Sequence, residues 1–254
     1  MSKTFIIAEA GANHDRNKSQ AYRLIEEAIN AGADAVKFQT YSSDTLYSKY
    51  TPDFAGYKNI TKLIKDIELP RTWQRDLKLY CDDNGIEFMS TPFDEKAVDE
   101  LYDLGIKRFK IAGFEATDPR FVKYVASTGL PIIISLGIGS HNKTHLIKQW
   151  IRKESKAKIT LLHANHAYPT PFKDINLGEL KHMEHWVSIH KDIDYGLSDH
   201  TEGILTPPIA VSMGAKVIEK HYTIDRSLSG PDHPFAIEPD ELKEMVKNIR
   251  LVET

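Results

Sequence analysis

Short apolar segments alternate with amphipathic helical segments along the whole chain of 254 residues. Strands that are buried on both faces form continuous apolar runs, as in parallel sheets covered by helices. Eight segments have this character and are predicted strands: residues 5–8, 33–38, 86–90, 107–111, 131–135, 158–163, 194–197 and 216–219. The segments between them carry apolar residues at helical spacing, and the last predicted helix covers about 239–250.

This alternation predicts an α/β fold, a closed (β/α)8 TIM barrel formed by residues 1–254 as a single domain. Several helical segments end in a glycine just before the next strand, as at Gly32 and Gly214, which is a common helix-to-strand turn. A doubly wound open sheet is the alternative. It is disfavoured because there are eight strands and no glycine-rich dinucleotide-binding motif follows the first one.

The composition excludes several classes of protein. The formal net charge of −3 argues against a protein held on nucleic acid by a general positive field. Cys81 is the single cysteine, so no disulfide can form within the chain. The first residues lack the features of a signal peptide, and no apolar run approaches the ~20 residues of a membrane span. We therefore expect a cytoplasmic protein that binds neither nucleic acid nor a membrane.

Polar and charged residues collect where the predicted strands end. In a TIM barrel these strand ends and the loops after them form the catalytic face. A charged residue at the end of a buried strand costs several kcal/mol to desolvate unless it is paired. Lysines, acids and hydroxyls on one rim therefore indicate a pocket for an anionic ligand. The residues in these positions are Glu9, Asn13, Lys37, Gln39, Thr91, Lys110, Glu115, Ser135, His163, His166, Tyr168, Ser198, Asp199 and Glu219.

Two connections are much longer than the others and follow strands on this same face. Residues 40–71 form a polar and aromatic connection, and residues 221–238 form one that is rich in Asp, Gly, Pro and His. Connections beyond about 12–15 residues are commonly functional. Because both connections follow strands, we expect both to lie on the catalytic face.

Two histidines close the last two predicted strands. His200 follows the segment GLSD, and His221 follows the segment VIEK. Neighbouring parallel strands lie about 4.8 Å apart, so these imidazoles can converge on one ion. Neutral imidazole is the commonest protein metal ligand, and two ligands leave positions open for substrate. His200 and His221 are thus a candidate metal pair, with Asp199 placed to orient the ring of His200 rather than to bind the ion.

Eight segments together resemble the sialic acid synthase (N-acetylneuraminate synthase) family. They are IAEAGANH at 7–14, ADAVKFQT at 33–40, FMSTPFD at 88–94, KIA at 110–112, YPTP at 168–171, GLSDHTEG at 196–203, IEKHYT at 218–223 and GPDH at 230–233. The similarity covers nearly the whole chain, in order. It implies a TIM barrel that condenses phosphoenolpyruvate with an N-acylated amino sugar, or a related aldose, in surface carbohydrate biosynthesis. The products would be a sialic-acid-like α-keto acid and phosphate.

The resemblance also implies roles for single residues. His200 and His221 would bind a divalent metal ion, usually Mn2+ or Mg2+. The residues that would hold the phosphate and carboxylate of phosphoenolpyruvate are Lys37, Lys110, Ser135 and Ser198. Those that would face the sugar are Glu9, Gln39, Thr91, Tyr168 and Asp232, with Asn13 grouped among the substrate-binding residues. Glu115 and Glu219 would handle protons or position water.

Three sites depart from the family pattern around the phosphoenolpyruvate pocket. Gly113 stands where the family has a serine, and Leu136 stands where it has a threonine. The run ANHA at 164–167 replaces a Cys-Thr-Ser-Asn-like run, which places His166 and Ala167 before the tyrosine. Because hydroxyl donors are lost at these sites, it stays open whether phosphoenolpyruvate is still the donor. His166 is a candidate cationic replacement.

Two other hypotheses remain. One is an aldolase or lyase on the same barrel that uses a different keto-acid donor, with Lys110 as a Schiff-base nucleophile or the metal stabilising an enolate. The other is a binding subunit without catalysis, which the metal pair, lysines and carboxylates disfavour. The resemblance implies an antifreeze-protein-like domain after the barrel in most family members, and we expect no such domain within residues 1–254. The resemblance then implies a homodimer, a separate partner protein in place of that domain, or a substrate that does not need it.

Overall fold

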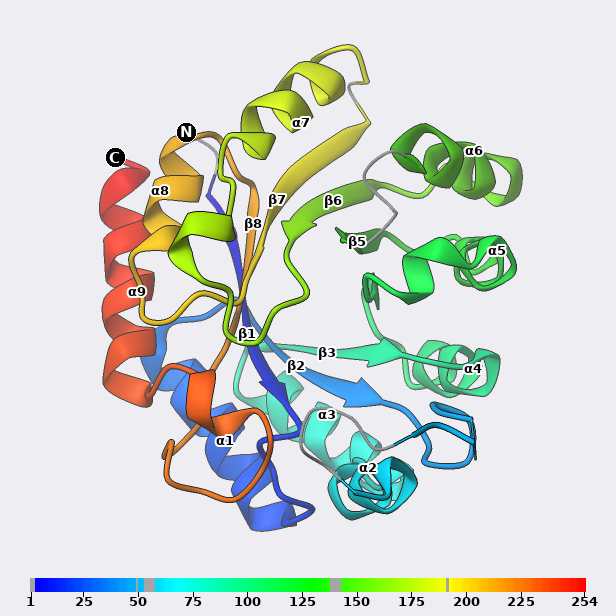
Figure 1. Cartoon of the computed structure of the whole chain (residues 1–254), viewed down its shortest axis with the longest axis vertical. Helices are drawn as coiled ribbons and strands as arrows, with labels where there is room; N and C mark the ends of the chain where they lie inside the picture. Colours follow the sequence, from blue (N-terminus) through cyan, green and yellow to red (C-terminus); the bar gives the residue numbers. More distant parts are fainter. Residues whose placement is uncertain (1–2, 49, 53–57, 138–142, 191) are drawn as a thin grey trace.

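Eight parallel strands form a barrel, and helices surround it (Figure 1). The computed structural model of the protein describes residues 3–48, 50–52, 58–137, 143–190 and 192–254. The strands are β1 Phe5–Gly11, β2 Ala35–Thr40, β3 Glu87–Pro92, β4 Phe109–Ile111, β5 Ile132–Leu136, β6 Ile159–Ala164, β7 Ile193–Asp199 and β8 Val217–His221. All eight predicted strands are present, with ends that differ by a few residues, so the predicted α/β barrel is confirmed.

The strands are joined in the order β3-β2-β1-β8-β7-β6-β5-β4, and the ladders between them are parallel. β3 and β4 stand at the two ends of this order and lie next to each other. Within the described residues no backbone ladder joins these two strands, so the barrel is nearly rather than fully closed. β4 has only three residues, fewer than predicted, which leaves little backbone for pairing.

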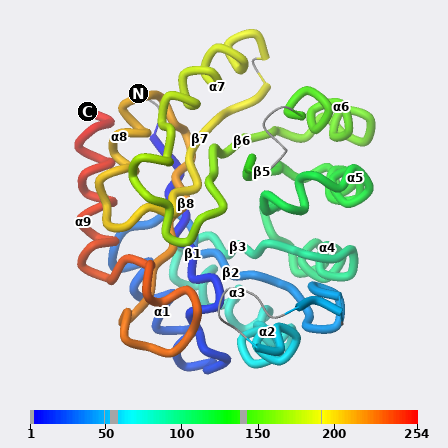
Figure 2. The backbone as a smooth tube through the Cα atoms, viewed as in Figure 1, coloured from blue at the N-terminus to red at the C-terminus, as the bar shows by residue number. Residues whose placement is uncertain are grey.

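The helices form the outer layer, and the last one lies beside the first (Figure 2). They are α1 Lys18–Ala31, α2 Ile60–Ile67, α3 Gln74–Asp83, α4 Glu95–Asp103, α5 Pro119–Ser127, α6 Thr144–Glu154, α7 Glu179–Ser188, α8 Thr206–Ser212 and α9 Pro239–Val252. Their ends follow local chemistry. The side chain of Asn17 accepts hydrogen bonds from two amides at the start of α1, and Gly32 ends that helix at a φ of 80°. Among the described helices, none has the length and apolar character to cross a membrane.

The connection between β2 and β3 differs from the single long loop that we expect from the sequence. It contains α2, which buries Ile60 and Ile64 against Tyr41. These two isoleucines are four residues apart and therefore share one face of a helix. Residues 49 and 53–57 of this connection lie outside the described residues.

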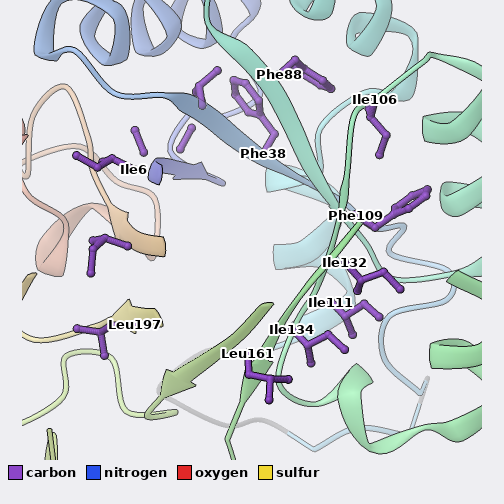
Figure 3. Close-up of a cluster of buried hydrophobic side chains, with 14 of the residues drawn as sticks. Ile6, Phe38, Phe88, Ile106, Phe109, Ile111, Ile132, Ile134, Leu161 and Leu197 are labelled. Atoms are coloured by element: carbon purple, nitrogen blue, oxygen red, sulfur yellow. The ribbon is translucent and has the colours of Figure 1, made fainter. Parts of the chain in front are cut away.

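Side chains that leave the strands on the outer side build the main core with the helices. Phe38, Phe88, Phe109 and Leu197 are buried in it (Figure 3). Phe38 and Phe88 come from neighbouring strands and stack with their ring centroids 6.0 Å apart. Each large apolar side chain buried in this way stabilises the fold by about 1.5–3 kcal/mol. This core holds the strands whose inner faces carry the site.

The inside of the barrel has an apolar layer with polar residues two positions further along the strands. The apolar layer consists of Ile7, Ala35, Met89, Ile133, Leu162 and Val217. Because side chains alternate along a strand, residues two positions later point to the same side. Five of those residues are polar, namely Glu9, Lys37, Thr91, Ser135 and Glu219, and the sixth is Ala164. The strand pattern therefore places a polar ring directly above an apolar floor.

A buried ion pair joins the ends of β7 and β8 on their outer side. Lys220 Nζ lies 2.7 Å from Asp199 Oδ2, and both side chains are almost completely buried. The same ammonium group donates to the carbonyl of Thr201, and Asp199 and Lys220 are partners in the β7–β8 ladder. Each member of the pair directly precedes one of the two candidate metal histidines. The pair therefore fixes the two strand ends that carry those histidines.

Replacing Lys220 by methionine is expected to lower the free energy of unfolding by about 3–5 kcal/mol, because the carboxylate of Asp199 then stays buried without its cation. A matched control is Lys158→Met. Lys158 Nζ also lies 2.6 Å from an aspartate, Asp194, but the lysine side chain is 62% exposed. An exposed pair contributes about 0–1 kcal/mol, so this control should unfold in urea almost as the wild type does. Equal losses in the two variants would contradict the role given to the buried pair.

Candidate active site

A pocket of about 60 Å³ opens where the strands end. Most of the residues predicted for the site line it, and they come from every strand of the barrel or from the loops after them. The lining residues are Glu9, Lys37, Gln39, Thr91, Phe93, Lys110, Ala112, Gly113, Ser135, Ala164, His166, Tyr168, Ser198, His200, Glu219 and His221. The strand ends therefore bring together residues that are far apart in the sequence.

Four buried charges occupy the base of this pocket. Lys37 Nζ lies 2.7 Å from Glu9 Oε2 and 3.7 Å from Glu219 Oε2. Lys110 Nζ lies 3.2 Å from Glu219 Oε1. All four side chains are at most 5% exposed. Glu219 thus links two lysines that come from β2 and β4.

Hydroxyl and amide groups complete the bonding of this cluster. Lys37 donates to Thr91 Oγ1 at 2.9 Å, and Ser198 donates to Glu219 Oε1 at 3.0 Å. Gln39 donates from Nε2 to Glu9 Oε1 at 2.9 Å. By contrast, the buried hydroxyl of Ser135 has no hydrogen-bond partner among the described residues. A buried polar atom without a partner is costly, which favours a ligand that reaches it.

The two carboxylates of the cluster have opposite pKa shifts. Burial raises the pKa of Glu9, and its nearest cation, Lys37, only partly opposes this. Burial also disfavours ionisation of Glu219, but the charges of Lys110 and Lys37 outweigh it and hold the pKa of Glu219 below its usual value. Burial lowers the pKa of Lys110. Glu219 is therefore the carboxylate that stays ionised between the two lysines, and Glu9 is the carboxyl group that takes up a proton more readily.

The two candidate metal histidines face one another beside this cluster. Their ring centroids are 5.5 Å apart and the ring planes are inclined by 48°. His200 Nδ1 lies 2.7 Å from the carbonyl oxygen of Asn165, which leaves Nε2 as its lone-pair atom if Nδ1 carries the proton. Burial lowers the pKa of His200 to about 4, and burial together with the charge of His200 lowers that of His221. Both rings are therefore neutral at pH 7, as a metal ligand must be.

The histidine pair fits the binding of one divalent ion. The Nδ1 atom of His221 is buried and has no hydrogen-bond partner among the described residues, although Asp232 Oδ2 lies 3.8 Å away. A separation of 5.5 Å between ring centroids allows both rings to reach an ion at about 2.0–2.2 Å. In the described part of the chain, no cluster of three or more His, Cys, Asp or Glu side chains is arranged to hold a metal. Two imidazoles are thus the protein's contribution, and the metal stays a prediction.

Tyr168 lies over the histidine pair. Its ring centroid is 4.3 Å from that of His200 and 6.2 Å from that of His221. It also packs edge to face on Phe235, at 5.5 Å, in the long connection after β8. Half of its surface remains exposed. Tyr168 therefore forms the boundary between the pocket and solvent.

The loop after β8 is bound to the loop after β1 through a buried histidine. His233 is completely buried, and its Nε2 lies 3.0 Å from both carboxylate oxygens of Asp15. Its Nδ1 atom lies 2.5 Å from Thr223 Oγ1. Asp15 holds a left-handed backbone conformation, with φ at 47°. This contact fixes the position of the neighbouring residue, Asp232, near His221.

Comparison with known proteins gives a family for this barrel. The model of the NeuB family matches residues 24–254. The chain belongs to the NeuB family. It is 40% identical to N,N'-diacetyllegionaminic acid synthase of Legionella pneumophila over 98% of this chain and 72% of the relative. It is 33% identical to N-acetylneuraminate-9-phosphate synthase of Homo sapiens over 98% of this chain and 70% of the relative.

A solved structure supports the same family. The N-acetylneuraminic acid synthetase of Leptospira borgpetersenii superposes on this NeuB-family chain with a TM-score of 0.89 at 33% sequence identity. The match covers 99% of this chain and 84% of the other. The resemblance to the sialic acid synthase family is therefore confirmed, and the chain is an enzyme of the synthase type.

Three residues predicted for the site do not line the pocket of this NeuB-family barrel. Asn13 instead donates to the carbonyl of Tyr222 at 2.8 Å and so joins two loops. Glu115 lies in the short helical turn Glu115–Thr117 after β4, where burial raises its pKa. Asp232 approaches His221 from the long loop after β8. All three lie in loops after strands, whose paths the strand pattern does not predict.

The structure also corrects the expectation for Asp199. The sequence predicts that this residue orients the ring of His200, but its carboxylate binds Lys220 and Thr201 instead. Its side chain leaves β7 on the outer side, and the carbonyl of Asn165 contacts His200 Nδ1. His163 likewise lies outside the pocket, with Nε2 2.7 Å from the carbonyl of Ile175. Strand alternation explains both outcomes, because each residue is one position away from an inward one.

Phe93, Ala112 and Ala164 line the pocket although the sequence reasoning did not select them. Polar residues at strand ends are the pattern that predicts site residues, and these three are apolar. Their signal was position alone, since each lies at or just after a strand end. Apolar walls of this kind exclude water and strengthen the electrostatic interactions beside them.

The side chains of Asp232 and His221 lie close to the backbone of Gly11, where a larger residue would displace them. A Cβ atom at Gly11, where φ is +51°, would lie 2.9 Å from Asp232 Oδ2 and 3.4 Å from His221 Cε1. Gly11→Ala is expected to lower turnover by roughly ten- to a hundredfold by displacing these groups. Gly129→Ala is the matched control, because Gly129 has a φ of +77° and open space around it.

Both alanine variants should lose about 1–2 kcal/mol of unfolding free energy from backbone strain, measured in urea. The Gly129→Ala enzyme should keep its turnover. Full turnover in Gly11→Ala would show that the close approach of Asp232 is not needed for activity.

Proposed function

We propose that this enzyme condenses phosphoenolpyruvate with an N-acylated amino sugar, or a related aldose, and releases phosphate and a sialic-acid-like α-keto acid. The observation that carries the proposal is that two buried lysines and two neutral histidines line the same pocket. The lysine part suits a small polyanion, and the histidine part suits a divalent ion that contacts a carbonyl group. The named relatives, which are synthases of legionaminic acid and of N-acetylneuraminate 9-phosphate, support a sugar as the second substrate.

Phosphoenolpyruvate would bind at the cationic part of the pocket. Lys37 and Lys110 would neutralise its phosphate and carboxylate, and Ser135 and Ser198 would donate hydrogen bonds to them. The unpartnered hydroxyl of Ser135 supports this placement. Both lysines are already desolvated and held by Glu219, so little reorganisation is needed when charge develops in the reaction.

The sugar would bind towards β1, β2 and Tyr168. Gln39 and Glu9 already form a hydrogen bond there and offer donor and acceptor groups to hydroxyls. Tyr168 would cover the bound sugar, and Thr91 would lie between the two substrates. Asp232 and Asn13, in the adjoining loops, would contact the sugar or hold the loops that do.

His200 and His221 would hold the divalent ion, for which Mn2+ or Mg2+ is proposed. Such an ion would polarise the aldehyde of the open-chain sugar. Their neutral state at pH 7 and the unpartnered Nδ1 of His221 support this role.

The bond changes balance with one water molecule. The methylene carbon of phosphoenolpyruvate forms a carbon–carbon bond to the aldehyde carbon, whose oxygen takes up a proton. Water then adds to the carbon that bears the phosphate, and the tetrahedral intermediate expels phosphate to leave a keto group. Glu219, between the lysines, and Glu115, near Lys110, are placed to position this water or accept its protons.

One observation favours a second candidate, an aldolase or lyase with a different keto-acid donor. Burial lowers the pKa of Lys110, and lysines that form Schiff bases are activated in this way. The amine would attack the keto carbon and lose water to form the imine. The ion pair with Glu219 opposes this role, because it stabilises the protonated lysine.

The decisive experiment measures release of inorganic phosphate from phosphoenolpyruvate by the purified full chain. Release is expected only when both an N-acylated amino sugar and a divalent ion are present. Release without any sugar would contradict the condensation. If a broad panel of sugars gives no release and borohydride traps a keto acid on Lys110, the aldolase replaces the synthase.

His221→Ala is expected to reduce metal-dependent turnover by more than about a hundredfold, because one of two protein ligands is lost. Its unfolding transition should stay close to that of the wild type, measured by circular dichroism. His182→Ala is the control, since this histidine is exposed on α7 and pairs only with Glu179 in the described residues. Wild-type turnover of His221→Ala at saturating metal would contradict the assignment of this ligand.

A further inference from the structure

The side chain of His166 lies against two glycines at the ends of neighbouring strands. A Cβ atom at Gly113, after β4, would lie 2.2 Å from His166 Nε2. A Cβ atom at Gly137, after β5, would lie 1.5 Å from His166 Cε1. Real Cβ atoms essentially never come within 3.0 Å of another heavy atom, so the imidazole fills the space of both missing side chains.

This position brings His166 to the cationic part of the pocket. The ring lines the pocket together with Lys110 and Ser135, which are the inward residues of β4 and β5. The ring of Phe114 packs against that of His166, with ring centroids 4.8 Å apart. The Ser135 hydroxyl at this part of the pocket is buried and has no hydrogen-bond partner in the described chain. A ligand with acceptor oxygens is what these neighbours would bind.

His166 is not placed as a third metal ligand. The candidate metal histidines lie at the ends of β7 and β8, whereas the glycines against which the ring of His166 packs follow β4 and β5, on the other side of β6. The described residues also contain no cluster of three metal-binding side chains. An imidazole that lies beside a lysine and a serine hydroxyl instead offers an N–H group to an anion.

We propose that His166 binds the phosphate group of the phosphorylated donor, with Gly113 and Gly137 providing the space for its ring. The inference rests on the proposed function for the identity of the donor, but phosphate binding can be measured without turnover. The imidazole N–H donates to a phosphate oxygen that also faces Lys110 and Ser135. Hydrogen bonds to charged groups of this kind are among the stronger ones in proteins.

The test is calorimetric titration of the full-length protein with inorganic phosphate, with phosphoenolpyruvate and with pyruvate. His166→Ala is expected to weaken phosphate and phosphoenolpyruvate binding by about ten- to a hundredfold. Pyruvate has the carboxylate without the phosphate, so its affinity should not change. His166→Gln keeps a donor and should restore part of the loss, while the exposed His182→Ala control should bind as the wild type does.

Gly113→Ala tests the space around the ring. The new methyl group displaces His166, so this variant should lose phosphate affinity to the same degree as His166→Ala. The double variant should be no worse than either single variant, because both act through one contact. Unchanged phosphate affinity in His166→Ala, or an equal loss of pyruvate and phosphate binding, would overturn the proposal.

Turnover separates this inference from the proposed function. If wild-type enzyme makes the keto acid, the KM for phosphoenolpyruvate should rise in His166→Ala while the KM for the sugar stays the same. A selective loss of phosphate affinity without any condensation by the wild type would keep the phosphate site and refute the synthase. Condensation with an unchanged KM for phosphoenolpyruvate in His166→Ala would support the synthase and refute the phosphate site at His166.

Discussion

The ion cluster of Glu219 with Lys37 and Lys110 is the interaction on which the site depends. Two ammonium groups at the end of a barrel, almost without solvent, would be very costly if they had no counter-charge. Glu219 contacts both, and the two lysines keep it ionised. Glu9 supplies a second carboxyl group to Lys37. The protein can therefore hold two cations ready for an anion without losing the folded state.

The barrel geometry explains why this cluster can form at all. Parallel strands end on one rim, so inward residues two positions above the apolar floor meet there from different parts of the chain. The outward residues at the same level stabilise the fold instead. Asp199 and Lys220 join β7 to β8 on the helix side, and in each case the next residue along the chain is a histidine that lines the pocket. One position along the strand thus separates a stabilising pair from a candidate ligand pair.

The sequence was sufficient to predict the features that depend on the strand pattern. It did not predict the contacts that depend on which residues become neighbours in the folded chain. Lys37, Lys110 and His221 could be placed on the rim because each lies at or near the end of a predicted strand, and their convergence follows from the parallel barrel. Asp199 was assigned wrongly because it adjoins His200 in the sequence, whereas strand alternation turns its side chain outwards to Lys220. The helix α2 in the long connection was missed because the polar and aromatic composition of residues 40–71 indicated a loop. The packing of His166 against two glycines could not be predicted, since it joins loops from three strands.

The pocket has two chemically different parts, and their arrangement limits the reactions it can support. Lys110, Ser135 and His166 gather donors over β4 and β5, whereas the neutral imidazoles of His200 and His221 lie over β7 and β8. A single small anion needs only the first part. A carbonyl compound that contacts an ion needs only the second. Because Glu219 borders both, a reaction that joins an anionic donor to an aldehyde acceptor uses the whole pocket.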